Sequence, residues 1–257
     1  MPTSDPSCEP EGPLVTPIPA EPPSTDTILD GKHVTLKPLL ESHVEELYSA
    51  VGGIQNVNLY KYLSTGPFYD VEAFAQHTDF LCRRTVLFPY TIFSKLSATP
   101  SAGAQLNSSE AHNSTATGII CLLNIVPIHR SIEIGYLLFG PHLQRTTAAT
   151  ETCYLLMKHC FEDLHYLRVE WKTNCFNEAS KRAALRLGFV FEGVFRKHMV
   201  VKGRSRDSAW FSVTDEEWAG GVKKALEDWL RNDNFDEKGI QKLKLEDIRR
   251  RLVKKNA

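Results

Sequence analysis

Residues 142–152, HLQRTTAATET, combine side chains that suit an anion-binding site. They lie between a predicted strand and the longest amphipathic stretch of the chain, so we expect a helix to begin near Thr146. The first turn of a helix leaves backbone N–H groups unpaired and carries partial positive charge, which favours a phosphate. The small side chains of residues 147–149 would let such a group approach the backbone, and Arg145 would add a fixed charge. The same composition is also typical of a helix that is merely capped by Thr146 or Thr147.

Glu133 is a carboxylate that could take part in proton transfer. It lies in RSIEIGYLLFG, residues 130–140, where Ile132 and Ile134 alternate with it and predict a strand with one apolar face. A carboxylate there could accept the proton of an attacking nucleophile, directly or through water. The alternative is a solvent-facing strand residue that pairs with a Lys or an Arg.

Asn177 and Ser180 belong to a third segment, NEASKRAALRLG. Their spacing of three puts both side chains on the same side of a helix start. Asn177 is a suitable N-cap for that helix, and Gly188 is suited to end it. Interpreted locally, Asn177 caps the helix and Ser180 simply follows.

The stretch from SIEIGYLLFGPHLQRTTAATE through RVEWKTNCFNEASKRAALRLGFVFEGVFRKHMVVKGRSRDSAWFSV resembles the GNAT superfamily of acyl-CoA N-acyltransferases. It is most similar to the branch typified by RimJ/RimL ribosomal-protein N-terminal acetyltransferases. The resemblance implies an α/β (α+β) fold, in which helices flank a mixed, mostly antiparallel twisted sheet. It also implies that the strand of Glu133 carries a bulge and splays from the strand YLRVEWKT, so that the pantetheine arm of the cofactor enters the gap.

The pyrophosphate loop of this family is usually written Q/R-x-x-G-x-G/A. This chain has Gln144, then Thr147 in place of the first glycine and Ala149 at the second position. In right-handed helical geometry Thr147 would still direct its N–H at a phosphate, and only its side chain would add bulk. The resemblance therefore implies acetyl-CoA as co-substrate. The implied cofactor-binding residues are Leu143, Gln144, Arg145, Thr146, Thr147, Ala148, Ala149, Thr150 and Asn177.

By the same resemblance, Glu133 is the expected proton acceptor and Ser180 is the expected proton donor near the sulfur. Asn177 would hydrogen-bond the amide-bearing arm of the cofactor. Many relatives use a Tyr as the donor, so Tyr136 and Tyr166 are reserve candidates, although either could be a packing residue. The residues expected to border the acceptor amine are Tyr62, Phe68, Tyr136 and Trp171. Packing is the alternative role of these side chains, and core packing is the favoured role of the tryptophan.

The implied reaction transfers an acetyl group to a primary amine, of a protein N-terminus or a small molecule, by direct attack in a ternary complex. An α-amino group has a pKa of ~7.7–8.0 and lysine of ~10.4, so neutralising lysine at neutral pH costs roughly 3–4 kcal/mol more. A single carboxylate base therefore suits an α-amine or a weakly basic amine. A catalytically silent GNAT-fold protein that binds CoA or a partner is the alternative. A third hypothesis is a ribosome-associated factor that uses RRRLVKK at 249–255, a run more typical of a solvated helix face.

The remaining pattern predicts one α/β domain with strands and helices in alternation. We expect strands at 33–38, 87–95, 117–127, 130–140, 166–173, 189–201 and 206–214, and helices at 41–51, 70–84, 146–164, 177–188, 215–230 and within 237–255. Phe74, Phe80 and Leu81 are expected on the apolar side of the second helix. Residues 1–26 are expected to be a disordered Pro-rich tail. Residues 27–231 would form the acetyltransferase domain, with a low-complexity loop insertion at 97–116, and 232–257 would form a C-terminal helical extension.

Composition excludes several classes of protein. The formal net charge of -1 gives no general attraction to nucleic acid or an acidic membrane, and we expect no specific nucleic-acid partner. Six cysteines without a CxxC pair predict reduced thiols. No apolar run approaches the ~20 residues of a membrane span, and the N-terminus lacks the order of a signal peptide, so we expect a cytoplasmic protein. The histidines show no paired metal-site spacing, so no metal is expected. The expected assembly is a monomer or a homodimer.

Overall fold

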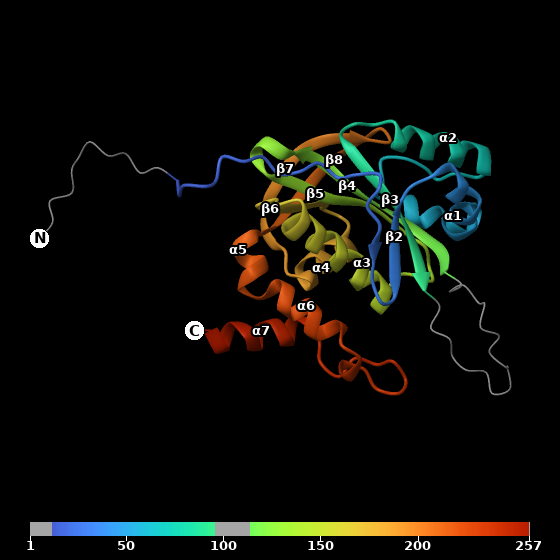
Figure 1. Cartoon of the computed structure of the whole chain (residues 1–257). Helices are drawn as coiled ribbons and strands as arrows, with labels where there is room; N and C mark the ends of the chain where they lie inside the picture. The colour runs from blue at the N-terminus through green and yellow to red at the C-terminus, as the bar shows by residue number, and fades with distance from the viewer. Residues whose placement is uncertain (1–11, 96–113, 257) are drawn as a thin grey trace, which may run out of the picture.

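One mixed sheet forms the centre of the molecule (Figure 1). The computed structural model describes residues 12–95 and 114–256, and its eight strands follow the order β1-β2-β3-β4-β5-β6-β8-β7. Neighbouring strands pair antiparallel except β5 and β6, which are parallel. The mostly antiparallel sheet predicted from the sequence is therefore confirmed. The strands are β1 Leu29–Asp30, β2 Val34–Pro38, β3 Leu87–Lys95, β4 Ser114–Val126, β5 Ser131–Phe139, β6 Arg168–Asn174, β7 Val190–Val201 and β8 Arg204–Thr214.

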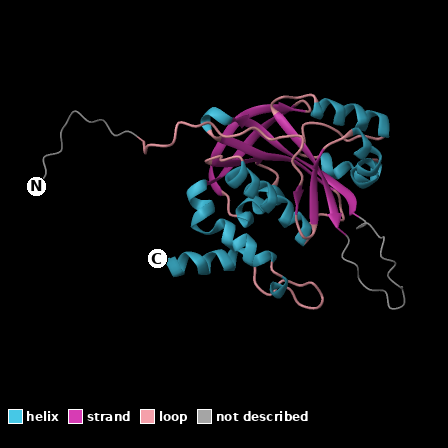
Figure 2. Cartoon of the chain, viewed as in Figure 1, coloured by secondary structure: helices cyan, strands magenta, loops and turns pink. Residues whose placement is uncertain are grey.

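Helices flank this sheet, as Figure 2 shows. The N-terminal pair, α1 and α2, lies apart from the group formed by α3, α4, α6 and α7. The helices are α1 Val44–Val51, α2 Val71–Cys82, α3 Thr147–Lys158, α4 Glu178–Leu187, α5 Asp215–Glu217, α6 Lys223–Leu230 and α7 Leu245–Asn256. A π-helical turn, His159–Asp163, extends α3, so the predicted helix at 146–164 is present.

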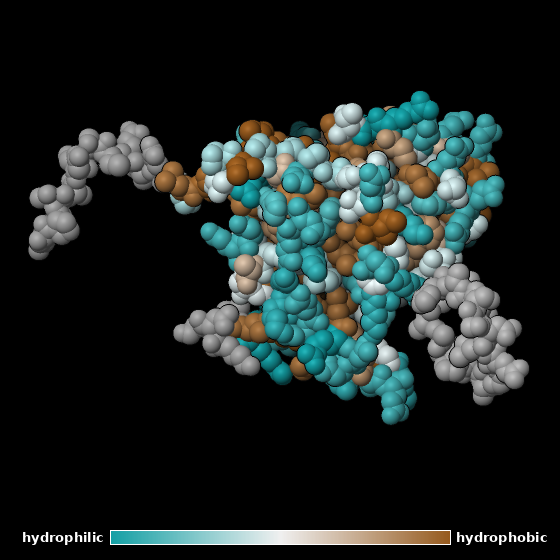
Figure 3. Space-filling view, in the orientation of Figure 1, coloured by the Kyte–Doolittle hydropathy of each residue, from teal (hydrophilic) through white to brown (hydrophobic). Residues whose placement is uncertain are grey.

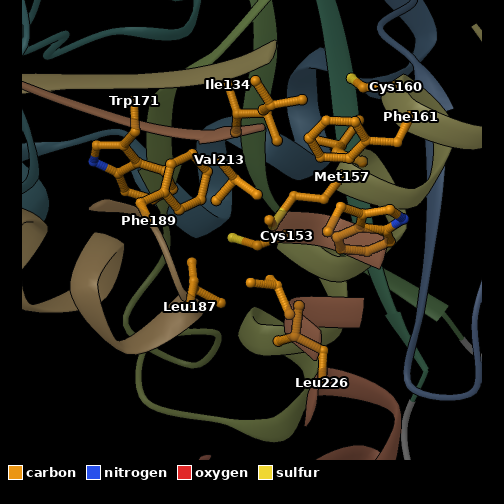
Figure 4. Packing of buried hydrophobic residues seen from close by; sticks show 14 of the residues in the cluster. Ile134, Cys153, Met157, Cys160, Phe161, Trp171, Leu187, Phe189, Val213 and Leu226 are labelled. Atoms are coloured by element: carbon orange, nitrogen blue, oxygen red, sulfur yellow. The ribbon is translucent and has the colours of Figure 1, made fainter. Parts of the chain in front are cut away.

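Two apolar cores lie on the two faces of the sheet, because side chains alternate along each strand. On β4, Ile119 and Cys121 join the core beneath α1 and α2. Their neighbours Ile120 and Leu122 join the larger core beneath α3, α4 and α6. Figure 4 shows part of this larger core, where Trp171 and other buried side chains of the sheet meet those of the helices.

Local sequence signals define several helix ends as predicted. The carboxylate of Asp70 accepts the N–H of Ala73 at 2.7 Å and caps α2. Gly188 ends α4 at a φ of 109°, a conformation that glycine adopts without strain. The predicted burial of Phe80 is wrong, since half of its surface is exposed, whereas Phe74 and Leu81 are buried. At 100° per residue, Phe80 lies about 240° around the helix from Phe74 and leaves the apolar stripe.

The segments outside the central domain gave mixed outcomes. Ala20 is buried, and the Ala20 and Glu21 N–H groups donate to the carbonyls of Pro127 and Leu164. The prediction of a disordered tail is therefore wrong for this part of residues 12–26, because the backbone finds partners on the domain. Residues 1–11 lie outside the described part, as does most of the expected insertion at 97–116, whose last residues begin β4.

The expected C-terminal extension contains α7, which packs on α4 and α6 of the domain. The predicted helix at 215–230 is interrupted at Gly221, where φ is 151°. Hydrophilic residues cover much of the face in view, and hydrophobic residues show in separate patches, one of them near its centre (Figure 3). Within residues 12–95 and 114–256, no helix combines the length and the apolar character needed to cross a membrane.

Candidate active site

A split between β5 and β6 is the central feature of the site. The two strands pair only at Ser131–Arg168, Ile132–Val169 and Glu133–Glu170. Beyond Glu133 both strands continue, but no further pairing joins them, so they diverge. Tyr136 has a φ of 50°, and the register between β4 and β5 also shifts in this region. The bulge and the splayed strands expected from the sequence are therefore present, and the split begins at Glu133.

The N-terminus of α3 follows the far end of β5. Thr146 caps the helix: its hydroxyl accepts the N–H of Ala149 at 3.1 Å and donates to the carbonyl of Leu143 at 2.6 Å. Arg145 holds a left-handed conformation, with φ at 62°, that turns the chain into the helix. Thr147 begins α3 in ordinary helical geometry. The cap takes the N–H of Ala149, so the N–H groups of Thr147 and Ala148 are the ones that remain for an anion at this helix end.

The remaining side chains of this segment divide into exposed and buried ones. Gln144 and Arg145 are exposed, and the side-chain amide of Gln144 donates to the carbonyl of Phe139 at 2.9 Å. Ala148 and Ala149 are partly exposed, whereas Leu143 and Thr150 are buried. The N–H of Leu143 donates to the Gly140 carbonyl at 3.0 Å, so the two buried residues shape the helix start from within.

A buried carboxylate fixes the direction of α3. Glu151 accepts the backbone N–H groups of Lys32, His33 and Val34 at 2.9, 2.5 and 3.0 Å. These bonds join the second turn of α3 to the start of β2, so the end of the helix has a defined place beside the sheet.

Glu133 lies in a buried cluster of charged and polar side chains. It is only 5% exposed. Its Oε2 accepts from the amide of Asn124 at 2.6 Å and lies 3.0 Å from Nζ of Lys172. Burial raises the pKa of the Glu133 carboxyl above its usual value, while Lys172 and Asn124 act in the opposite direction. This carboxylate is therefore partnered and also more basic than an exposed one.

The start of α4 lies beside β6, one of the two strands of the split. Asn177 caps α4 and accepts the N–H of Ser180 through Oδ1 at 3.2 Å, as its local interpretation predicts. Ser180 Oγ also accepts the indole N–H of Trp171 at 3.0 Å. An indole N–H can only donate, so the hydroxyl proton of Ser180 stays free to be donated elsewhere.

Trp171 is 3% exposed and packs against Phe189 in the larger core (Figure 4). It shares its face of β6 with the buried residues Val169 and Thr173. This placement does not make it a wall of an open groove, and it fits the packing role that the sequence favoured.

An aromatic cluster lies beside the bulge of β5. The hydroxyl of Tyr136 is 2.7 Å from Nε2 of His77 and 3.0 Å from the hydroxyl of Thr65. Phe68 stacks on His77, with ring centroids 4.8 Å apart. Burial lowers the pKa of His77 to about 4 and raises that of the Tyr136 hydroxyl. Both groups are thus neutral near pH 7, and they join residues 65–68 to the bulge.

Three segments far apart in sequence meet near the start of α4. The hydroxyl of Tyr62 donates to the carbonyl of Phe176 at 2.9 Å. Lys202, at the tip of the β7–β8 hairpin, donates to the carbonyl of Tyr60 at 2.8 Å. Tyr166, the other reserve candidate, is buried in the larger core and does not join these residues.

Sequence reasoning missed Lys172, Asn124 and His77. These three residues lie 9 to 59 positions along the chain from the side chain that each one contacts, Glu133 or Tyr136. The one signal present was the alternation Arg168-Glu170-Lys172, which marks a charged face of β6. Within the described residues, no group of three His, Cys, Asp or Glu side chains is arranged to hold a metal ion.

The family profile described as Acetyltransferase (GNAT) domain matches residues 33–190. The chain belongs to the GNAT acetyltransferase family. A crystal structure of a GCN5-related N-acetyltransferase from Brucella melitensis is 35% identical, with a TM-score of 0.80 over 91% of this GNAT chain and 98% of that one. A probable GNAT-family acetyltransferase from Chromobacterium violaceum is 32% identical, with a TM-score of 0.70 over 84% and 100% of the two chains.

Curated relatives cover less of this GNAT chain. The putative ribosomal N-acetyltransferase YdaF of Bacillus subtilis is 32% identical over 46% of this chain and 65% of its own length. The uncharacterized N-acetyltransferase YoaA of the same organism is 34% identical over 33% of this chain and 48% of its own length. The match thus spans less than two thirds of the length of each curated relative. A RimL structure with bound CoA has the same fold at 21% identity, with a TM-score of 0.57 over 73% of this chain and 98% of that one. The matches confirm the family predicted from the sequence, and the RimL structure shares its fold.

Proposed function

We propose that this GNAT protein transfers an acetyl group from acetyl-CoA to a primary amine in a ternary complex. The observation that carries the proposal is the split between β5 and β6. A buried, partnered carboxylate, Glu133, lies where the split begins, and the N-terminus of α3 follows its far end. One end can thus bind a diphosphate and the other can accept a proton.

The cofactor would be bound mainly by backbone groups. The N–H groups of Thr147 and Ala148 would face the pyrophosphate, since that of Ala149 donates to the Thr146 cap, and the exposed Arg145 would add positive charge. The edge of β6 that faces away from β8 is unpaired beyond Glu170, so it can hydrogen-bond the amide-bearing arm. The side-chain amide of Asn177 would add a donor there, since its oxygen already caps α4.

The reaction needs two proton transfers. The neutral amine attacks the thioester carbonyl carbon, a C–N bond forms and the C–S bond breaks. Glu133 accepts the amine proton, directly or through water. Ser180 donates its hydroxyl proton to the departing sulfur, while the indole of Trp171 stabilises the oxygen that remains.

The acceptor would enter beside the β5 bulge. The residues proposed to border the acceptor are Tyr62, Phe68 and Tyr136. Phe68 and Tyr136 belong to the aromatic cluster, and Tyr62 holds the neighbouring loop against the start of α4. A single carboxylate whose pKa is raised, such as Glu133, is best suited to an amine of modest basicity. Deprotonating a lysine at neutral pH costs about 3–4 kcal/mol more than deprotonating an α-amine. We therefore propose a protein N-terminus or a small-molecule amine as acceptor.

Calorimetric titration with acetyl-CoA and with CoA tests the first half of this proposal, and thiol release over a panel of peptides and small amines tests the second. We expect saturable binding and release that depends on the amine. Binding without release by either wild type or Glu133→Gln would favour the silent CoA-binding alternative. No binding at high protein concentration would argue against both functions.

A further inference from the structure

The contacts of Lys172 distinguish it from the other charged residues of the sheet. It lies on β6 directly beside the start of the split, with its side chain only 11% exposed. Its Nζ is 3.0 Å from Glu133 Oε2, 2.8 Å from Glu170 Oε2 and 4.0 Å from the centre of the Trp210 ring. A buried ammonium between two carboxylates and an indole face is held in one position.

The two carboxylates do not depend equally on Lys172. Glu170 has a second cationic partner, since Nε of Arg168 lies 2.8 Å from its other oxygen. For Glu133, the only ion-pair partner among the described residues is Lys172; its remaining hydrogen bond comes from the neutral amide of Asn124. Arg206 on β8 acts on Glu133 electrostatically without an ion-pair contact. Removing Lys172 would therefore leave Glu133, but not Glu170, as a buried charge without a paired cation.

We propose that Lys172 is a positioning residue that keeps the Glu133 carboxylate ionised and directed at the start of the split. The inference rests on the proposed function, in which Glu133 accepts the amine proton. The groups that face this carboxylate have opposing effects. Lys172 and Arg206 favour its charged form, whereas the neighbouring charge of Glu170 and burial disfavour it. The pKa of Glu133 should then respond to Lys172 and Glu170 in opposite directions.

Carbon NMR of protein labelled at the glutamate side-chain carboxyl tests this without any turnover. The Glu133 signal is assigned by its absence in Glu133→Gln. In Lys172→Met we expect its titration midpoint at higher pH than in wild type, because the favourable charge is gone. In Glu170→Gln we expect it at lower pH, because the competing negative charge is gone. A midpoint unchanged in both variants would overturn the inference.

The pH profile of acetylation provides the second readout. At about pH 6 we expect Lys172→Met to lose on the order of tenfold in kcat and to recover as the pH approaches 9, since a paired charge within ~4–6 Å favours ionisation by at least about one pKa unit. Lys172→Arg should restore much of the profile because it keeps the charge. A uniform loss at all pH values, with Lys172→Arg equally impaired, would indicate a merely structural role and overturn the inference.

Controls separate this inference from the proposed function. Lys223→Met breaks a more exposed ion pair, that of Lys223 on α6 with Glu162 in the turn after α3, 2.7 Å apart, and should leave both readouts unchanged. If the carboxyl signals shift as expected but wild type acetylates no amine, the electrostatic role stands and the proposed function fails. If wild type acetylates amines through Glu133 but Lys172→Met keeps the wild-type profile, the role of Lys172 fails alone.

Discussion

The two ends of the split between β5 and β6 are built in different ways. At the α3 end, one continuous segment, residues 140–150, supplies the turn, the cap and the exposed N–H groups. At the other end, Glu133 is surrounded by side chains from β4, β6 and β8. The first end depends on backbone geometry that tolerates many side chains. The Glu133 end depends on a few buried charges. Removing one of them leaves its partner buried without a compensating charge.

This difference predicts where the protein is sensitive to substitution. A helix terminus binds through groups that every residue except proline carries, so a departure such as Thr147 changes bulk and little else. A buried carboxylate depends on its hydrogen-bond donors, because it has lost its contact with water. We therefore expect substitutions at the Glu133 end to affect rate and pH dependence, and substitutions at the α3 end to affect cofactor affinity.

The largest effect is expected at the carboxylate. Glu133→Gln preserves the shape and an oxygen for Asn124 and Lys172 but cannot accept a proton. We expect kcat to fall by about 10²–10⁴, the usual range for removal of a general base, with acetyl-CoA affinity retained. Steady-state kinetics and calorimetry on the same samples measure both quantities. Full activity in this variant would show that another group or water is the base.

The second-largest effect is expected at the N-terminus of α3, where a substitution should weaken the binding of acetyl-CoA. Ala149→Asp puts a carboxylate in the first turn of α3, where it suits the helix but repels a phosphate. Like charges about 4 Å apart near a surface cost about 4 kcal/mol, so we expect binding about a thousandfold weaker. Ala149→Ser is the matched control and should bind nearly as wild type. Unchanged affinity in the aspartate variant would show that the diphosphate does not bind at this helix end.

His77, on the proposed acceptor side, can be tested through the pH dependence of the free energy of unfolding. The pKa of His77 is about 4 in the folded protein, below its ordinary value of 6.5, because of burial. Between these values the unfolded chain binds more protons, so stability is lost as pH falls from about 6.5 to 4, by about 3 kcal/mol in total. His77→Gln keeps a partner for Tyr136 and should lack this loss. The free energy of unfolding of both proteins is measured by denaturant titration between pH 4 and 6.5. If it changes with pH equally in wild type and in His77→Gln, His77 is not a buried neutral histidine.

The smallest effect is expected at the missing glycine of the loop. Thr147→Gly removes a partly exposed side chain from the start of α3 without changing the direction of its N–H. We expect CoA affinity to increase by less than about tenfold, or about 1.4 kcal/mol, as measured by calorimetry. A much larger gain would show that the threonine side chain obstructs the diphosphate, and that the α3 end is less tolerant than its backbone geometry indicates.

The elements of the fold could be predicted because their signals are local. Asp70, Asn177 and Gly188 mark helix ends through bonds that span three or four residues, and all three act there as expected. The predicted strand 87–95 is β3. The main errors concern segments whose state depends on distant partners. Residues 20 and 21 looked like a free tail, but their N–H groups bond to carbonyls more than a hundred residues away.

The features of the candidate site also fall into two groups, those set by local sequence and those set by distant partners. The sequence by itself determined a helix start rich in small residues after a strand, and a carboxylate in that strand. Only the tertiary structure decided that Lys172, Asn124 and Glu170 surround this carboxylate. Helix caps form between residues close in the chain, so the local sequence predicts them. Burial and ion pairing depend on which strands lie side by side, and that is decided when the whole sheet assembles.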